Sequence, residues 1–337
     1  MKVKEFLKKK DIVISLKRYG VEAMGAMTLG LFSSLIMGLI LREIGRRVGI
    51  DFMVDMGGWA MGATGYAIGV AVAYGLKAPP LVIFSSAAVG FVGDYLGGPA
   101  GGFIAALIGA ELGKLVSKET KVDIIVTPVV TLMTGMGIAL AVGPAIGWFM
   151  TTIGDFIMWA TELIPSVMGA IVAVVMGMAL TGPISSAALS IMLGLSGIAA
   201  GAAVAGCAAN MVGFAVASYR ENKVSGLVSQ GLGTSMLQLP NIIKNPRIWI
   251  PPIIASAVAG IISAAVFRME NIPEGAGMGT SGLVGQFGAF TAMGFTWVVF
   301  VQVVIVHFVL PAVICILVSE FMRKKGWIKF GDMKLDA

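Results

Sequence analysis

The stretch SQGLGTSMLQLPNIIKNPRIWIPP, residues 229–252, decides how the whole chain is interpreted. It concentrates amide and hydroxyl side chains together with four prolines, yet the chain around it is 57% hydrophobic and only 12% charged. Soluble globular chains carry about a quarter charged residues. The composition therefore indicates a membrane protein, and the polar stretch needs an explanation within a membrane.

Basic residues flank this stretch on both sides. Arg220 and Lys223 precede it, and Lys244 and Arg247 follow it. A single helical crossing by residues 224–243 would place the two basic pairs on opposite faces, which the positive-inside rule disfavours. Two arms of about ten residues, each about 15 Å of helix, would instead reach the middle of a bilayer and return.

We therefore predict a re-entrant hairpin with Gly231, Gly233, Thr234 and Ser235 near its tip. Irregular backbone at that depth occurs only where protein buries it or where it lines a cavity. The alternative is an ordinary cytoplasmic loop with an amphipathic helix, because proline and glycine interrupt helices in either setting.

Apolar runs of spanning length recur along the chain. They predict an all-α polytopic membrane protein with about eight to ten transmembrane helices. Residues 1–20 are expected to form a basic cytoplasmic or interfacial segment, residues 21–320 the transmembrane domain, and residues 321–337 a cytoplasmic tail. The net charge of +6 comes from Lys and Arg beside the apolar runs, which indicates topology signals rather than a nucleic-acid partner.

Asp94 and Glu111 are carboxylates within apolar sequence, on either side of a glycine- and proline-rich break at residues 97–102. An ionisable side chain inside a span is costly to bury and marks a functional site. We predict that both bind substrate and that they face one cavity across the break. The alternatives are an interfacial position for Asp94 and a surface ion pair between Glu111 and Lys114.

The sequence predicts no metal site and no cofactor. Cys207 and Cys315 lie in apolar sequence without a second ligand at metal-binding spacing. His307 is the single histidine and has no acid nearby in sequence, which indicates a packed or interfacial residue rather than a proton relay.

At GTSMLQLP, residues 233–240, the chain resembles the membrane (IIC) components of the bacterial phosphotransferase system. The motif of that family is Gly-Ile-Thr-Glu, followed four positions on by proline. Here the glycine and the proline are kept, Thr234 and Ser235 replace Ile-Thr, and Met236 takes the glutamate position. The resemblance covers roughly residues 15–320. It is closest to the fructose/mannitol type and to a stand-alone branch that includes the perfringolysin regulator proteins.

Two further family motifs have weaker counterparts. ALTGPISSAA, residues 179–188, is similar to Asp-Met-Gly-Gly-Pro followed by Asn-Lys, with Gly182 and Pro183 matching and Ala179 replacing the acid. GTSG, residues 279–282, falls at the position of Pro-His-Gly-Gly and has no histidine.

The resemblance implies a IIC-like bundle with re-entrant hairpins that translocates a sugar or polyol by alternating access. It also implies a homodimer in the bacterial cytoplasmic membrane and a separate IIB protein as the phosphoryl donor. The polar side chains of the hairpin either bind the solute or satisfy backbone groups at the bend. Those of the second non-helical stretch, residues 271–286, either complete the site from the opposite side or belong to an external loop. These candidates are Thr234, Ser235, Gln238, Asn241, Thr280 and Ser281.

The departures from the motifs leave other functions open. A carboxylate accepts a sugar hydroxyl with charge assistance, and methionine does not. The chain is then either a permease of the phosphotransferase type, a diverged membrane sensor or regulator, or a transporter of a less polar metabolite.

Overall fold

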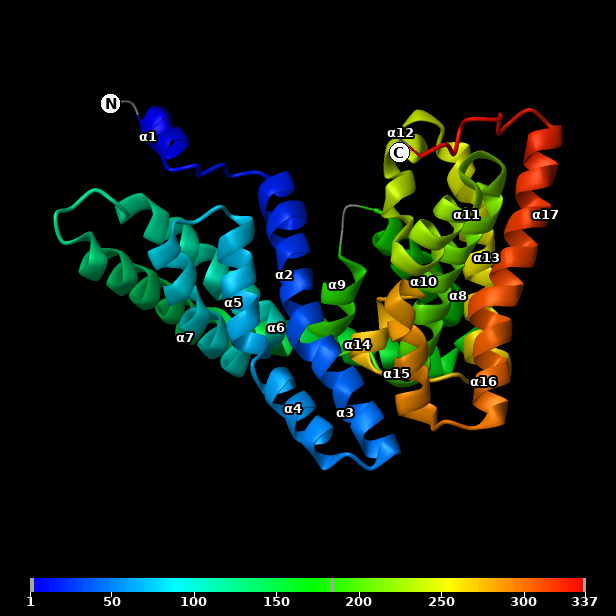
Figure 1. The fold of residues 1–337 in the computed structure, drawn as a ribbon, viewed down its shortest axis with the longest axis horizontal. Helices are drawn as coiled ribbons and strands as arrows, with labels where there is room; N and C mark the ends of the chain where they lie inside the picture. The colour runs from blue at the N-terminus through cyan, green and yellow to red at the C-terminus, as the bar shows by residue number, and fades with distance from the viewer. Residues whose placement is uncertain (1–2, 183–184, 336–337) are drawn as a thin grey trace. The chain divides into compact units, whose positions relative to one another are not determined.

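The computed structural model describes residues 3–182 and 185–335 and is built from helices (Figure 1). Within those ranges the only β-pairing is an isolated bridge between Gly197 and Asn271. Contacts divide the chain into two compact units, Met1–Thr152 and Ile153–Ala337, and the boundary lies inside helix α7. The prediction of an all-α membrane protein is confirmed.

The first unit contains a long interrupted helix, a pair of short helices, a hairpin and the start of a very long helix. Its elements are α1 (Val3–Lys9), η1 (Lys17–Ala23), α2 (Met24–Leu31), η2 (Phe32–Ile36), α3 (Met37–Val48), α4 (Asp51–Gly62), α5 (Thr64–Gly75), α6 (Pro80–Val116) and α7 (Asp123–Leu163).

Helix α6 folds back on itself, as the glycine-rich break predicts. Its backbone leaves the helical conformation at Gly97 and Gly98, and φ of +63° at Gly98 favours glycine. A Cβ added to Gly113 would lie 3.1 Å from a methyl carbon of Val82, so the ends of α6 are neighbours. The element is therefore an antiparallel hairpin, with two arms of about 26 Å each.

Close glycine contacts hold α5 against the first arm of α6. A Cβ added to Gly69 would collide with the carbonyl oxygen of Ser86, and one added to Gly90 would collide with that of Gly65. Small residues let helix backbones approach where lipid gives no hydrophobic drive for association. The Gly65-x-x-x-Gly69 spacing thus allows the close packing of α5 on α6.

The second unit surrounds one buried helix. Its elements after α7 are α8 (Pro165–Thr181), α9 (Ser186–Met192), α10 (Gly197–Ala217), α11 (Tyr219–Val228), η3 (Ser229–Gly233), η4 (Ser235–Gln238), α12 (Leu239–Lys244), η5 (Pro246–Trp249), α13 (Ile250–Ile261), η6 (Ile262–Val266), α14 (Pro273–Ala276), η7 (Ser281–Leu283), α15 (Val284–Met293), α16 (Trp297–Val304), η8 (Ile305–Val309) and α17 (Leu310–Lys324).

Helix α10 is the centre of this unit. It packs against α8, α13 and α17, and nearly all of its residues are buried. Gly206 makes this packing possible, because a Cβ there would collide with the carbonyl oxygen of Ala173 on α8.

Six helical stretches in the described residues are long and apolar enough to cross a membrane. They are Lys17–Arg46, Pro80–Val116, Asp123–Leu163, Gly197–Ala217, Pro246–Val266 and Trp297–Lys324. The 17-residue α8 is a shorter apolar helix, and Pro80–Val116 is a hairpin rather than one straight span. The polytopic architecture is confirmed, and the number of eight to ten spans stays a prediction.

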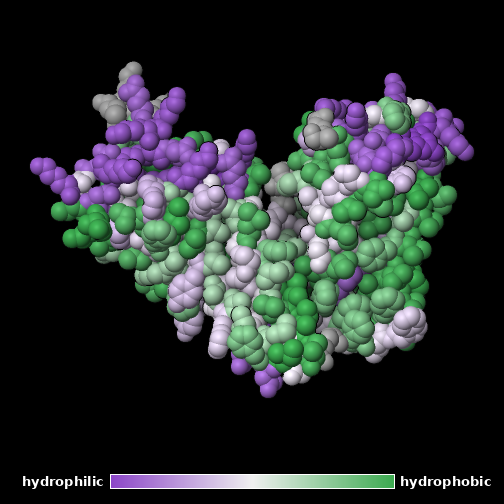
Figure 2. Space-filling model, viewed as in Figure 1, coloured by the Kyte–Doolittle hydropathy of each residue, from purple (hydrophilic) through white to green (hydrophobic). Residues whose placement is uncertain are grey.

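The surface of each unit fits a membrane environment. Figure 2 shows hydrophilic residues gathered over α1 in the first unit and over α11, α12 and the C-terminal segment in the second. Hydrophobic surface covers the helices away from these ends (Figure 2). The domain boundaries expected at residues 20 and 320 stay predictions.

Candidate functional site

The polar stretch of the second unit forms a helical hairpin. One arm consists of α11 and η3, and the other of η4 and α12. Between them Thr234 is extended, with φ of −161° and ψ of 141°, and its hydroxyl accepts a hydrogen bond from the Met236 backbone N–H at 3.2 Å. The predicted break at Thr234 is therefore present, and both flanking basic pairs lie toward the base of the hairpin.

The tip of this hairpin lies alongside α10, well inside its length. A Cβ on Gly231 would lie 3.5 Å from Ala215, and Ser235 is joined through Thr181 to Asn210. Asn210 precedes the end of α10 at Ala217 by seven residues, or about 10 Å of helix. This depth supports the re-entrant interpretation.

A buried network of neutral polar groups surrounds the tip. The hydroxyl oxygens of Ser235 and Thr181 are 2.7 Å apart, and Thr181 donates to Asn210 Oδ1 at 3.0 Å. The Thr181 hydroxyl also lies 3.2 Å from the Gly177 carbonyl oxygen, and either hydroxyl of the Ser235–Thr181 pair can be the donor. Asn210 also accepts from Trp249 Nε1 at 3.0 Å and donates to the Ser256 hydroxyl at 2.9 Å. Asn210 thus joins α8, α10, α13 and the hairpin.

Amide side chains connect the two arms of the hairpin. Gln238 Nε2 donates to Gln230 Oε1 at 2.8 Å across the bend, and Asn241 Nδ2 donates to Gln238 Oε1 at 2.9 Å. Gln230 in turn donates to the Ser218 hydroxyl at 2.9 Å. Gln230 and Gln238 are fully buried, and Asn241 is buried at the edge of a pocket.

The second non-helical stretch reaches the same hairpin. The hydroxyl of Thr280 donates to the carbonyl oxygen of Gly231, and Thr280 is fully buried. Gly279 beside it has φ of +54° and packs against the backbone of α10 at Cys207. Ser281 begins η7 and is half-buried, outside the bonds described above. Of the two predicted residues, Thr280 contacts the hairpin directly.

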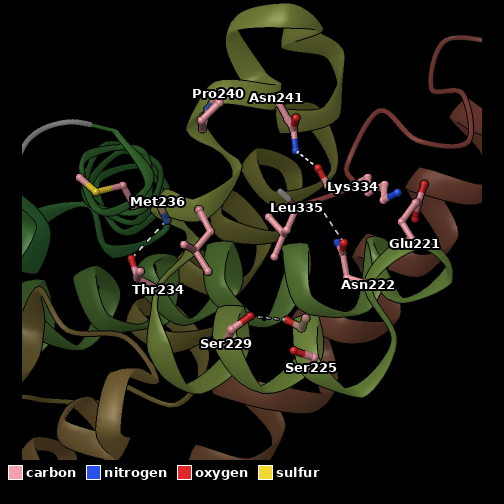
Figure 3. A pocket seen from close by; sticks show the side chains of 12 residues that line it. Glu221, Asn222, Ser225, Ser229, Thr234, Met236, Pro240, Asn241, Lys334 and Leu335 are labelled. Atoms are coloured by element: carbon pink, nitrogen blue, oxygen red, sulfur yellow. Dashed lines mark hydrogen bonds between the residues drawn. The ribbon is translucent and has the colours of Figure 1, made fainter. Parts of the chain in front are cut away.

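A pocket of about 670 Å³ opens beside the hairpin (Figure 3). Hydroxyl and amide groups line it, among them Thr234, Ser229 and Asn241. Two charged residues also line it: Glu221, whose carboxylate pairs with Arg323, and Lys334. Met236, which occupies the position of the family glutamate, also lines it and is 39% exposed. Ser235 and Gln238 lie behind this wall, in the buried networks.

The predicted carboxylates belong to the first unit. Asp94 is half-buried against α5, where a Cβ on Gly65 would lie 3.1 Å from Asp94 Oδ2. Across the hairpin Asp94 faces Gly102, which precedes Glu111 by nine residues, or about 14 Å of helix. The two carboxylates therefore lie at different levels of the hairpin rather than side by side.

Glu111 forms an ion pair with Lys114, at 3.1 Å between Oε2 and Nζ. The expected alternative was a surface pair, but both residues are buried, with 8% and 1% of their surface exposed. The burial arises because the N-terminal segment covers the end of α6: Lys114 Nζ donates to the carbonyl oxygen of Asp11 at 2.9 Å and to that of Leu76 at 3.0 Å.

Arg18 completes this charged cluster. It donates to the carboxylates of Asp11 at 2.6 Å and Glu22 at 3.0 Å, and to the carbonyl oxygen of Leu76 at 2.7 Å. The cluster connects the N-terminal segment, the end of α5 and the end of α6. This arrangement gives Glu111 a role in the packing of the first unit.

A family model described as "Phosphotransferase system, EIIC" matches residues 21–335. The chain belongs to this family. The resemblance seen at the hairpin motif is confirmed at the family level, and the fructose/mannitol subtype stays a prediction. A search of curated proteins finds no match to the chain.

The Asn210 network of this EIIC chain includes four residues that were not among the sequence candidates: Thr181, Asn210, Trp249 and Ser256. Asn210 had a recognisable signal, because it is the only amide or charged side chain in the 21 residues of α10. A polar group in such a helix must find an internal partner. Thr181 and Ser256 lie in apolar runs as well, but small hydroxyls there often bond to their own helix, so their signal is weak.

A second buried polar pair lies apart from the hairpin. Gln286 Nε2 and His307 Nδ1 are 3.0 Å apart, and both residues are buried. His307 is thus a packed residue, as the sequence indicated. Pro183, the matching proline of the second motif, lies outside the described residues.

Proposed function

We propose that this EIIC protein is a permease that moves a sugar or polyol and holds it at the hairpin of the second unit. Membership in the EIIC family supports a membrane component of the sugar phosphotransferase system. The observation that carries the proposal is the polar pocket beside Thr234 and Asn241, backed by neutral hydrogen-bonding networks at Ser235 and Gln238.

The chemistry of this site suits a neutral, hydroxyl-rich solute. Each sugar hydroxyl both donates and accepts, and amide and hydroxyl side chains supply both functions. Met236, Leu237 and Pro240 line the same pocket and offer apolar surface for the carbon skeleton. Thr280 fixes the tip from the opposite side through Gly231. The substrate-binding roles of Asp94 and Ser281 remain predictions.

In the proposed mechanism the hairpin and the solute move together by alternating access, in a homodimer in the bacterial cytoplasmic membrane. The basic ends of the chain and the base of the hairpin face the cytoplasm, where a separate IIB protein docks and delivers phosphate to the bound sugar. Arg220, Lys223 and Lys244 are exposed at that base. Cys207 and Cys315 are fully buried, so neither is placed to receive a phosphoryl group from a partner.

Met236 favours a second candidate function. A methionine in the place of a glutamate makes the pocket less polar and removes a charged acceptor. A transporter of a less polar metabolite, or a membrane sensor that binds its ligand without phosphorylating it, fits this change.

Ligand-dependent thermal stabilisation tests the proposal. Ligands that bind the native state raise the melting temperature, so no assay of activity is needed. Sugars, sugar alcohols, their phosphates and less polar metabolites are screened against the purified chain. We expect a sugar or polyol to stabilise it, and Ser235→Ala, which removes a hydrogen bond behind the pocket wall at the hairpin tip, to weaken the shift.

Ser263→Ala is the matched control. Ser263 is also a fully buried serine of the second unit, and its hydroxyl has no hydrogen-bond partner among the described residues. We expect this variant to keep the full shift. Stabilisation by a non-sugar alone would refute the sugar assignment and favour the second candidate function.

A further inference from the structure

A segment of the C-terminal tail lies inside the hairpin groove. After α17 the chain crosses back toward α12 (Figure 1), and Lys334 and Leu335 lie between the two arms (Figure 3). Met333 is fully buried, and Lys334 and Leu335 form part of the pocket wall.

The first arm binds this segment through Asn222. Asn222 Nδ2 donates to the carbonyl oxygen of Met333 at 2.8 Å, and Asn222 Oδ1 accepts from the backbone N–H of Leu335 at 2.9 Å. One side-chain amide thus pairs with a carbonyl and an N–H on either side of Lys334, as a neighbouring strand would. The contact recognises backbone, independent of side-chain identity.

The second arm binds the same segment through two amides. Gln238 Nε2 donates to the carbonyl oxygen of Met333 at 2.9 Å, and Asn241 Nδ2 donates to that of Lys334 at 2.8 Å. These are side chains assigned above to the solute.

Apolar contacts add to these bonds. The Met333 side chain packs in a cluster with Phe214, Ile242 and Met322. Nearer α17, Asn245 Nδ2 donates to the Asp332 carboxylate at 2.8 Å. The groove therefore contains both a socket for one apolar side chain and polar groups for an extended backbone.

With the tail in place, neither amide has a free N–H. An amide nitrogen carries two hydrogens. Those of Gln238 go to Gln230 and Met333, and those of Asn241 go to Gln238 and Lys334. Departure of the tail frees one donor on each side chain.

We propose that the hairpin groove is a binding site for an extended peptide backbone, and that the tail segment 333–335 competes there with the transported solute. Only the competition with solute rests on the proposed function, because it requires that Gln238 and Asn241 bind both the solute and the tail. The peptide site itself does not depend on it. The seated tail occupies one N–H of Gln238 and one of Asn241, and its release frees these donors for the solute.

Alkylation of an introduced cysteine measures whether the tail is seated. In Ile242→Cys the thiol lies in the cluster that Met333 covers, since Ile242 is 5% exposed. In Ile243→Cys, the matched control, the thiol is open, since Ile243 is 74% exposed. The two native cysteines are fully buried and give a low background.

Each variant is prepared as the full chain and as a chain ending at Asp332, and both are treated with a water-soluble maleimide. We expect the shortened chain to react about tenfold faster or more at Ile242→Cys, since several hydrogen bonds and a buried side chain hold the segment. A synthetic peptide GDMKL, matching residues 331–335, should slow the reaction again. The rate at Ile243→Cys should not change.

Equal rates at Ile242→Cys in the two chains would overturn the peptide site. Should the shortened chain fail to fold, Asn222→Ala in the full chain replaces it. It removes two of the bonds to the tail and should also speed the reaction, and an unchanged rate would again overturn the site.

Mannitol and fructose at millimolar concentration test the competition. We expect them to speed alkylation of Ile242→Cys in the full chain and to stabilise the shortened chain more strongly. A thermal shift of equal size in both chains, with no change in alkylation, would overturn the competition and leave the proposed function intact. No thermal shift in either chain would count against the proposed function, while the alkylation rates still decide the peptide site.

Discussion

The charged cluster of the first unit and the hairpin tip of the second bury polar groups of opposite character. In the first, Arg18, Lys114 and Glu111 form a charged cluster at the ends of α5 and α6. In the second, Asn210 and its neighbours form a neutral network at the tip of a hairpin. Charges removed from water must stay paired, so a charged cluster fixes its elements in place. Neutral groups exchange partners at lower cost, which suits a site where a solute replaces an internal contact.

The largest effect on stability is expected from breaking the charged cluster. Lys114→Met leaves the Glu111 carboxylate buried without its cation, and we expect the free energy of unfolding to fall by about 3–5 kcal/mol. Unfolding in mixed micelles measures the change. Lys118→Met, at an exposed position four residues on, is the control and should lie close to the wild type. Similar values for the two variants would contradict the structural role of the cluster.

Asn210→Ala breaks the neutral network and should have the next largest effect. It removes the partner of Trp249 Nε1 and one partner each of Thr181 and Ser256, whose hydroxyls keep their bonds to backbone carbonyls, at a cost of about 2–4 kcal/mol. A double-mutant cycle with Ser256→Ala checks the assignment. The two changes share one hydrogen bond, so their effects should not add. Full additivity would show that the two side chains act independently.

Glycine packing in the first unit gives a smaller, steric effect. In Gly69→Ala the new methyl group meets the Ser86 carbonyl, and we expect a loss of about 1–3 kcal/mol. Gly137→Ala in α7 is the control, since a Cβ there has no neighbour within 4 Å. It should be neutral or slightly stabilising, because alanine favours helices. Thermal unfolding measures both variants, and an equal loss of stability in the two would rule out the close α5–α6 contact.

Ser235→Ala should have the smallest effect on stability and a large one on function. It removes the hydrogen bond to Thr181 at the hairpin tip, worth about 1 kcal/mol. Thermal unfolding without solute checks this value. A loss as large as that of Asn210→Ala would show that the tip is a fixed structural element like the charged cluster.

The sequence predicts the features that depend on local signals. The bend at Thr234 follows from glycine and proline between two basic pairs, and the fold-back of α6 follows from its glycine cluster. The polar network depends on contacts between distant residues: Ser235 meets Thr181 from 54 positions away, and Asn210 meets Ser256 from 46. No local pattern encodes these pairs.

Glu111 shows that burial by a segment distant in sequence limits such predictions. Its spacing to Lys114 gave a surface ion pair as the alternative to substrate binding. The pair is present, but the sequence around α6 does not tell that the N-terminal segment buries it. The role of Asn222 was missed for the same reason, since its partners come from the tail more than 100 positions later.

The central claim is that the solute lies at the hairpin tip of the second unit. Protection of Thr234→Cys from alkylation, in the full chain, tests it most directly, because Thr234 lines the pocket. We predict that a solute which raises the melting temperature also slows alkylation of Thr234→Cys and leaves the exposed Ile243→Cys unchanged. A stabilising solute that slows neither reaction would contradict the account and place the binding site elsewhere in the molecule.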